Sequence, residues 1–131
     1  MIVLDTHALV WWATDASALS ARARRAIQAA ARRGPAVAST ISLFEIATAV
    51  RRERLRLSVT LEQWLTDLRM LPDLHLEPVT SAIAQLAGSL DSSFPGDPAD
   101  RIIVATAIEL KGTLVTADAR LRQSQRVETV W

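Results

Sequence analysis

The chain has 131 residues, of which 50% are hydrophobic and 22% are charged. This length and composition favour one domain with its own core and exclude an intrinsically disordered chain. There is no cysteine and the net charge is only +1, so a disulfide framework and a thiolate zinc site are excluded, and a reducing compartment is favoured. Asp5 and His7 interrupt the first apolar run, which is too short to span a membrane. We therefore expect a soluble, cytoplasmic domain over residues 1–131.

Extended and helical segments alternate from the N-terminus, which predicts a layered α/β domain. The apolar run at 2–4 predicts a strand, and a helix is expected directly after it at 6–13. Ser20 is a good N-cap for a second helix, which Gly34-Pro35 ends. A short strand is then expected at 36–39.

Two capping boxes predict the next two helices. Ser42 with Glu45 forms the first box, and Thr60 with Gln63 forms the second. Apolar residues recur at helical spacing after each box. A third strand is expected at 74–77.

The last third of the chain continues the alternation. It predicts a helix at 81–90, a turn-rich loop at 91–96, a helix at 98–111, a strand at 113–116, a short helix, and a strand at 127–130. Asp97 is the expected N-cap of the long helix, Pro98 takes its first position, and Gly112 ends it.

Four acidic residues far apart in the sequence, Asp5, Glu45, Asp100 and Asp118, lie at or beyond the ends of short apolar runs. The carboxyl ends of parallel strands meet at one edge of a sheet, so these side chains are expected to converge. Carboxylates gathered in one place repel each other unless a cation holds them ionised. Oxygen ligands without cysteine or paired histidine select Mg²⁺ or Mn²⁺. The sequence therefore predicts a metal site suited to phosphate-ester chemistry.

Within this site Asp5 and Asp100 are the first choices as direct ligands. Asp118 and Glu45 are expected to complete the coordination directly or through water. The structural alternative is that each acid only caps a helix, because capping and the helix dipole both favour a carboxylate there. Caps alone, however, have no need to converge on one edge.

The neighbours of the acids have expected roles as well. Thr6 and Thr116 are expected to orient the ligands. Asp97 is expected to cap its helix rather than to bind metal. Arg101, next to Asp100, is a candidate either for contact with phosphate or for pairing with a nearby acid.

The remaining aromatic and imidazole groups are expected to be structural. His7 lies beside an apolar helix and is not included among the catalytic residues. Core or subunit contact is expected, in preference to base stacking, for Trp11, Trp12, Trp64 and Trp131.

The basic residues are almost all arginine, and they form two clusters. With the four site acids set aside, the rest of the chain carries a formal net charge of +5. Solvated helix faces explain most single arginines, whereas a rim of arginine around the acids would attract phosphate. The clusters comprise Arg22, Arg24, Arg25, Arg32 and Arg33, and then Arg51, Arg52, Arg54 and Arg56.

Four ordered motifs resemble those of the PIN domain family, and specifically the VapC-type toxins of bacterial toxin-antitoxin pairs. The motifs are LDTHALVWW at 4–12, ISLFEIA at 41–47, DPADRIIVATA at 97–107 and LVTAD at 114–118. The likeness covers the whole chain, 1–131, as a single PIN domain. Close relatives often carry histidine before the third motif where this chain has Phe94-Pro95-Gly96, which leaves substrate choice open.

The resemblance implies a three-layer α/β/α domain with a parallel sheet of about five strands. It also implies a metal-dependent endoribonuclease that forms a homodimer and is inhibited by a cognate antitoxin. The acidic set of the family maps onto Asp5, Glu45, Asp100 and Asp118, with none missing.

Two other classes of function stay open. A magnesium-dependent phosphatase is disfavoured because no Asp-x-Asp pair follows the first strand. A phospho-receiver domain would need a later lysine, and Lys111 is the only lysine in the chain. A non-catalytic partner-binding module would use the acids only as helix caps, and metal titration separates it from an enzyme.

Overall fold

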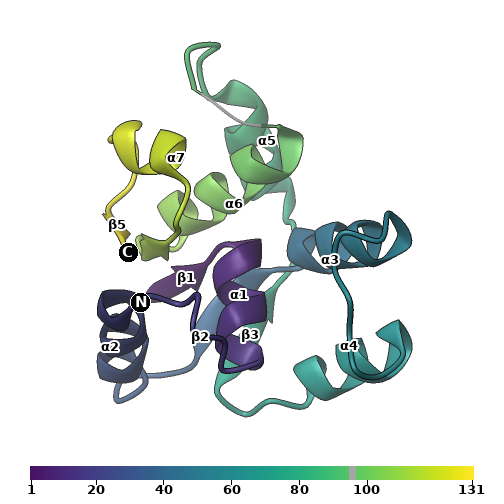
Figure 1. Cartoon of the computed structure of the whole chain (residues 1–131). Coiled ribbons are helices and arrows are strands. Elements are labelled where there is room, and N and C mark those ends of the chain that lie inside the picture. Colours follow the sequence, from purple (N-terminus) through teal and green to yellow (C-terminus); the bar gives the residue numbers. More distant parts are fainter. Residues whose placement is uncertain (95–96) are drawn as a thin grey trace.

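Five short strands form one sheet in the order β3-β2-β1-β4-β5 (Figure 1). The structure is a computed structural model that describes residues 1–94 and 97–131. All four strand pairings are parallel. The strands are β1 Ile2–Leu4, β2 Ala36–Ser39, β3 Leu74–Glu77, β4 Thr113–Val115 and β5 Thr129–Val130.

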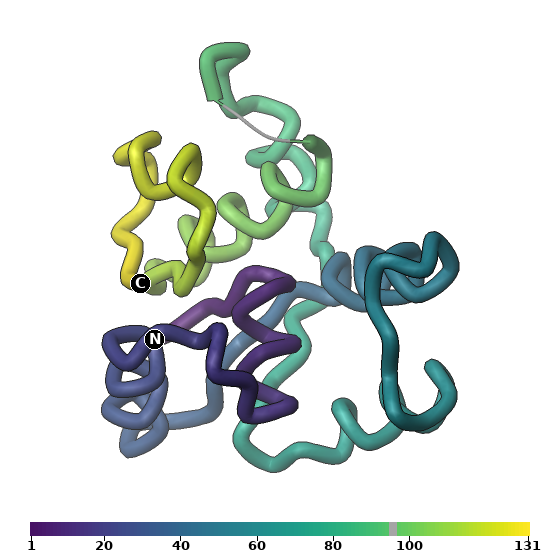
Figure 2. Tube along the Cα trace, viewed as in Figure 1, coloured from purple at the N-terminus to yellow at the C-terminus, as the bar shows by residue number. Residues whose placement is uncertain are grey.

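The strand order reverses beside β1. The chain builds outward from β1 through β2 to β3, and then returns to place β4 and β5 on the other side of β1. In Figure 2 the purple β1 segment accordingly lies between the teal residues of β3 and the yellow residues of β5. The gap between the carboxyl ends of β1 and β4 is therefore the topological switch point, where open α/β sheets bind their ligands.

Seven helices in the described chain connect and flank the strands. They are α1 Thr6–Ala13, α2 Ala21–Ala30, α3 Ile41–Arg51, α4 Leu61–Arg69, α5 Ser81–Ser89, α6 Pro98–Glu109 and α7 Ala119–Gln123. The hydroxyls of Ser20 and Thr60 accept N–H groups at the starts of α2 and α4, as predicted. The α/β class and the single parallel sheet of five strands are both confirmed.

Alternate residues of each strand point to opposite faces of the sheet, and in the central strands β1, β2 and β4 both faces are buried. Leu4, Ala38 and Val115 pack in one core cluster with residues of α1, α2 and α4. Val3, Val37 and Leu114 pack in the other with residues of α6 and α7. Helix α5 lies outside this second layer and packs on α6 through Ile83, Ala87 and Ala105. The result is the expected three-layer arrangement.

The predicted Ser42 cap was wrong. Helix α3 begins at Ile41 after Thr40, whose backbone is already helical, and its N-cap makes no side-chain hydrogen bond. The Ser39 hydroxyl instead accepts the N–H of Ile41 at 3.1 Å. Ser42 therefore lies inside the first turn, where its hydroxyl is available for a tertiary contact.

Several predicted ends were one or two residues too long. Helix α6 ends at Glu109, and Lys111 takes a left-handed conformation with φ of 55°. Gly112 follows that turn, where a Cβ atom would lie 3.1 Å from the carbonyl oxygen of Met1. The close approach of β4 to the start of β1 thus favours glycine at this position. The other shortened elements are α5, β4 and β5.

Two further expectations concern single segments. The predicted loop at 91–96 includes Pro95 and Gly96, which lie outside the described residues. No helix in the described part of the chain is both long enough and apolar enough to cross a bilayer.

Candidate metal-binding active site

The first wall of the site forms where β1 and β4 end side by side. Asp5 follows β1 and caps α1, since its Oδ1 accepts the N–H of Ala8 at 2.9 Å. Thr116 follows β4, and its hydroxyl donates to Oδ2 of Asp5 while accepting the N–H of Asp118 at 3.0 Å. Asp118 in turn caps α7. Local capping and strand pairing together thus fix the two carboxylates and the threonine between them.

The second wall comes from α1 and α3. The hydroxyl of Thr6 donates to Oε1 of Glu45 and lies 2.8 Å from the hydroxyl of Ser42. Because Thr6 has one hydroxyl hydrogen, Ser42 is the donor in the contact between these two hydroxyls. Ser42 therefore supports the Glu45 carboxylate through Thr6.

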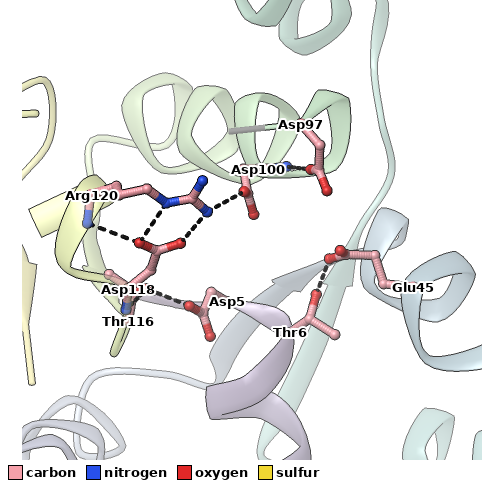
Figure 3. A network of polar contacts seen from close by, with 8 residues as sticks. All are labelled: Asp5, Thr6, Glu45, Asp97, Asp100, Thr116, Asp118 and Arg120. Carbon is pink, nitrogen blue, oxygen red and sulfur yellow. Dashed lines mark hydrogen bonds and ion pairs between the residues drawn. The ribbon is translucent and has the colours of Figure 1, made fainter. Parts of the chain in front are cut away.

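The third wall is the N-terminus of α6. Asp97 caps this helix as predicted, and its Oδ1 accepts the N–H of Asp100 at 3.0 Å. Carboxylate oxygens of Asp97 and Asp100 remain available on the side of Glu45. Glu45, Asp97 and Asp100 each offer one ligand atom, and these atoms lie within 4.8 Å of one another. Asp97 thus serves as a cap and also joins the tightest group of carboxylates in the described chain. Figure 3 shows Glu45 with Thr6 facing Asp97 and Asp100 across the site.

All four predicted acids line one cavity of about 490 Å³. The tightest group contains Asp100 and Glu45, whereas Asp5 and Asp118 stand together on the opposite wall (Figure 3). The lining residues are Asp5, Thr6, His7, Trp11, Glu45, Asp97, Asp100, Ile103, Ala117, Asp118 and Arg120. The structure therefore brings the predicted acids to one place, with Asp97 added.

The carboxylates of the site repel one another, and several have a raised pKa. Burial and the charges of Asp97 and Glu45 raise the pKa of Asp100 to about 6. Burial also raises the pKa of Asp5 and of Glu45, although hydrogen bonds from Ala8 N–H and the threonine hydroxyls oppose the rise. A cation among these oxygens would relieve both the repulsion and the desolvation.

Arg120 partly supplies such a charge, and sequence reasoning missed it. Its guanidinium lies 2.9 Å from Oδ2 of Asp118 and 3.7 Å from Oδ2 of Asp100. The hydrogen bonds from Arg120 hold the pKa of Asp118 below its usual value. An arginine on a short terminal helix resembles any solvated arginine in sequence, and only its position two residues after the Asp118 cap marks it.

Arg101 does not face the acids. It donates from Nε to the carbonyl of Ala87 at 3.1 Å, and from its other nitrogens to the carbonyls of Leu90 and Asp91. It therefore binds the C-terminal end of α5, where a cation suits the helix dipole. Among the described residues Arg101 makes no ion pair with an acid, and its predicted contact with phosphate stays a prediction.

Two other expectations also differ from the structure. His7 is exposed and lines the acidic cavity, so it is not confined to the core. The predicted core contact of the tryptophans is confirmed, although Trp11 lines the cavity as well; the four that pack against the core cluster are Trp11, Trp12, Trp64 and Trp131. No arginine of the two predicted clusters lines this cavity among the described residues, and Arg33 lies at the opposite edge of the sheet. The predicted arginine rim is therefore reduced to Arg120.

The donor set suits a hard divalent cation. Carboxylate and hydroxyl oxygens surround the cavity, and His7 is the one imidazole among the lining residues that the structure describes. Mg²⁺ and Mn²⁺ prefer such oxygen ligands, whereas most zinc sites include cysteine sulfur or several histidine nitrogens. The residues present therefore fit Mg²⁺ or Mn²⁺.

Comparison with known proteins agrees with this fold. Ribonuclease VapC22 of Mycobacterium tuberculosis (strain ATCC 25618 / H37Rv) is 42% identical over 132 residues, covering 99% of this chain and 98% of the relative. VapBC2 of Rickettsia felis, solved with a promoter DNA fragment, matches with a TM-score of 0.71 at 20% identity, covering 99% and 98% of the two chains. DNA-bound VapBC of Salmonella typhimurium matches with a TM-score of 0.70 at 16% identity, covering 98% of this chain and 96% of that chain. The PIN domain model matches residues 2–126, and the chain belongs to the PIN domain family.

Proposed function

We propose that the protein is a metal-dependent endoribonuclease of the VapC toxin type. The observation that carries this proposal is the convergence of five carboxylates on one cavity at the switch point of the sheet. The relative that is 42% identical along the whole chain is named a ribonuclease. The reaction is hydrolysis of an RNA phosphodiester bond.

Asp5, Glu45, Asp100 and Asp118 are proposed as the catalytic residues that hold Mg²⁺ or Mn²⁺. Asp97 joins them, since it completes the tightest group with Glu45 and Asp100. When bound, a divalent ion supplies positive charge against the scissile phosphate and acidifies the attacking water.

The chain's own residues keep this site in order. Thr116 orients Asp5, and Thr6 with Ser42 orients Glu45. Arg120 is 61% exposed, so its guanidinium can move from Asp118 to a phosphate oxygen of the substrate at little cost in desolvation. Burial of Asp5 limits the access of bulk water to the inner end of the site.

A cognate antitoxin is the proposed regulator, and a homodimer is the proposed assembly. Structures with the same fold include a toxin-antitoxin complex from Klebsiella pneumoniae, with a TM-score of 0.68 and 17% identity over 100% of this chain and 97% of that chain. The proposed location is the cytoplasm, where RNA substrate and antitoxin are both accessible.

The proposal is tested by incubating the purified protein with mixed cellular RNA, with Mg²⁺ and with chelator. Asp5→Asn and Asp100→Asn should each lower the cleavage rate at least about 100-fold, beyond the effect of losing an outer-shell contact. Glu109→Gln is the matched control, because Glu109 is exposed at the far end of the same helix as Asp100. Cleavage that survives chelation and both aspartate changes would refute the proposal.

A further inference from the structure

The acidic cavity has one wall of a different kind, formed by aromatic rings on α1. His7 and Trp11 are four residues apart, so they lie on the same face of this helix. Their ring centroids are 5.6 Å apart, with an angle of 43° between the planes. Both side chains line the cavity that holds the five carboxylates.

A third ring supports this wall from behind. The centroid of Trp131 lies 5.5 Å from that of Trp11, and Trp131 directly follows β5. Trp11 and Trp131 also pack against the core cluster beneath α1. The indole of Trp11 is therefore held in place before any ligand arrives, while His7 remains exposed in front of it.

The two walls match the two parts of a nucleotide. A phosphate group would contact the cation that the carboxylates are proposed to hold, whereas a base can stack on an aromatic surface. A cavity of about 490 Å³ lies within the usual range for a bound small molecule. Rings whose only role was to fill the core would be buried, yet His7 is open to solvent.

We propose that His7 and Trp11 form a stacking platform for one unpaired base of the RNA, next to the scissile phosphate. This inference rests on the proposed ribonuclease function and adds a positioning role for α1. Stacking requires a base that has left its pair, so the platform selects single-stranded segments or loops over duplex RNA. It accepts any base, because every base has an aromatic face.

The first test needs neither metal nor cleavage. The protein is titrated with adenosine and with ribose in the presence of chelator, while the indole N–H signals are followed by NMR. Adenosine should shift the Trp11 signal and saturate, and ribose should not. His7→Ala should weaken adenosine binding roughly 5-fold, which is the lower end of the effect of losing one stacking residue. His7 is exposed on a helix, so this change to alanine preserves folding.

Two tryptophan variants complete the test. Trp11→Phe retains an aromatic face and should retain most of the binding, whereas Trp11→Leu should lose it. Trp12→Leu is the matched control, because Trp12 is half-buried on the same helix but does not line the cavity. It should bind adenosine as the unchanged protein does. A well-dispersed NMR spectrum of each variant shows that it is folded.

Three results would overturn the inference. Equal shifts with adenosine and ribose would show that no base is recognised, and unchanged binding by His7→Ala would remove His7 from the platform. If a protein co-purifies with the unchanged chain but not with His7→Ala, and adenosine binding is the same in both, the aromatic wall contacts a protein partner instead of a base. Failure of the nuclease proposal would appear separately, as cleavage insensitive to Asp5→Asn and Asp100→Asn.

Discussion

The two edges of the sheet each carry a cavity, and the cavities differ in chemistry more than in size. The cavity at the carboxyl edge measures about 490 Å³ and is lined by five carboxylates. The one at the amino edge is larger, at about 570 Å³, and its lining is mainly apolar, with Arg33 and His75 as its charged or titratable side chains among the described residues. The larger cavity therefore lacks the groups that would hold a cation.

The direction of the strands explains this difference. At the carboxyl edge the chain enters helices, and the N–H groups of their first turns stabilise Asp5, Asp97 and Asp118 as caps. At the amino edge the chain enters strands, and close backbone approach dominates, as at Gly112 beside Met1. Carboxylates are thus favoured at one edge only, and that edge is where a metal site can form.

The largest effect outside the carboxylates is expected at Thr116. Thr116→Val keeps the shape of the side chain but removes the hydroxyl between Asp5 and the N–H of Asp118. We expect RNA cleavage to fall by about 10- to 100-fold, as for other groups that orient metal ligands. Thr106→Val is the control, since Thr106 is equally buried but bonds only to the carbonyl of Ile102 within α6. Equal rates for the two variants would contradict the role of Thr116.

A smaller effect is expected at Arg120. Arg120→Gln removes the charge near Asp118 and Asp100. Loss of one charged hydrogen bond to phosphate should weaken RNA binding about tenfold, and the variant should bind Mg²⁺ more tightly because one competing positive charge is gone. Arg122→Gln, exposed on the same helix, is the control for net charge. The two variants should differ in fluorescence-anisotropy titrations with single-stranded RNA.

A third prediction concerns stability without metal. The pKa of Asp100 rises from 3.8 to about 6 on folding, so between these values the folded protein binds more protons than the unfolded chain. Stability contributed by Asp100 is therefore lost as the pH rises through this window. Asp100→Asn should remove that part of the pH dependence, and near pH 7 it should raise Tm by a few degrees in chelator. The measurement is the Tm of both proteins in chelator as a function of pH. The same pH dependence of Tm in the unchanged protein and in Asp100→Asn would contradict the prediction.

The smallest effect is expected at the amino edge. His75 lines the larger cavity, and its Nε2 lies 2.8 Å from Oε2 of Glu77 in an exposed pair. His75→Ala should leave the cleavage rate within about twofold, because exposed pairs and surface changes have small effects. A larger loss of activity would show that the amino edge takes part in function, and would break the contrast between the two edges.

Sequence patterns predicted the fold and the convergence of the acids because both depend on local rules. Asp5, Asp97 and Asp118 are caps that can be recognised from their neighbours, and parallel strands bring their ends together. The roles of Ser42 and Arg101 could not be read in this way. Ser42 meets Thr6, which is 36 residues away in the sequence.

The position of Arg101 next to Asp100 in the sequence led to a wrong prediction that it could pair with an acid, and apart from the Asp118 cap no neighbouring residue indicated that Arg120 belongs to the site. Consecutive residues on a helix point in different directions, so Arg101 faces the end of α5 while Asp100 faces the site. Arg120 reaches Asp100 only because α7 folds beside the start of α6. The aromatic wall was missed for a similar reason, since Trp131 is placed behind Trp11 by the pairing of β5 with β4.

The central claim is that these carboxylates hold a divalent ion, and calorimetric titration of the purified protein with Mg²⁺ tests it most directly. The unchanged protein should bind Mg²⁺ with proton release near pH 6, because Asp100 must lose its proton to act as a ligand. Asp100→Asn should bind far more weakly, and Glu109→Gln should bind as the unchanged protein does. Absence of Mg²⁺ and Mn²⁺ binding, or equal binding by Asp100→Asn, would contradict the account.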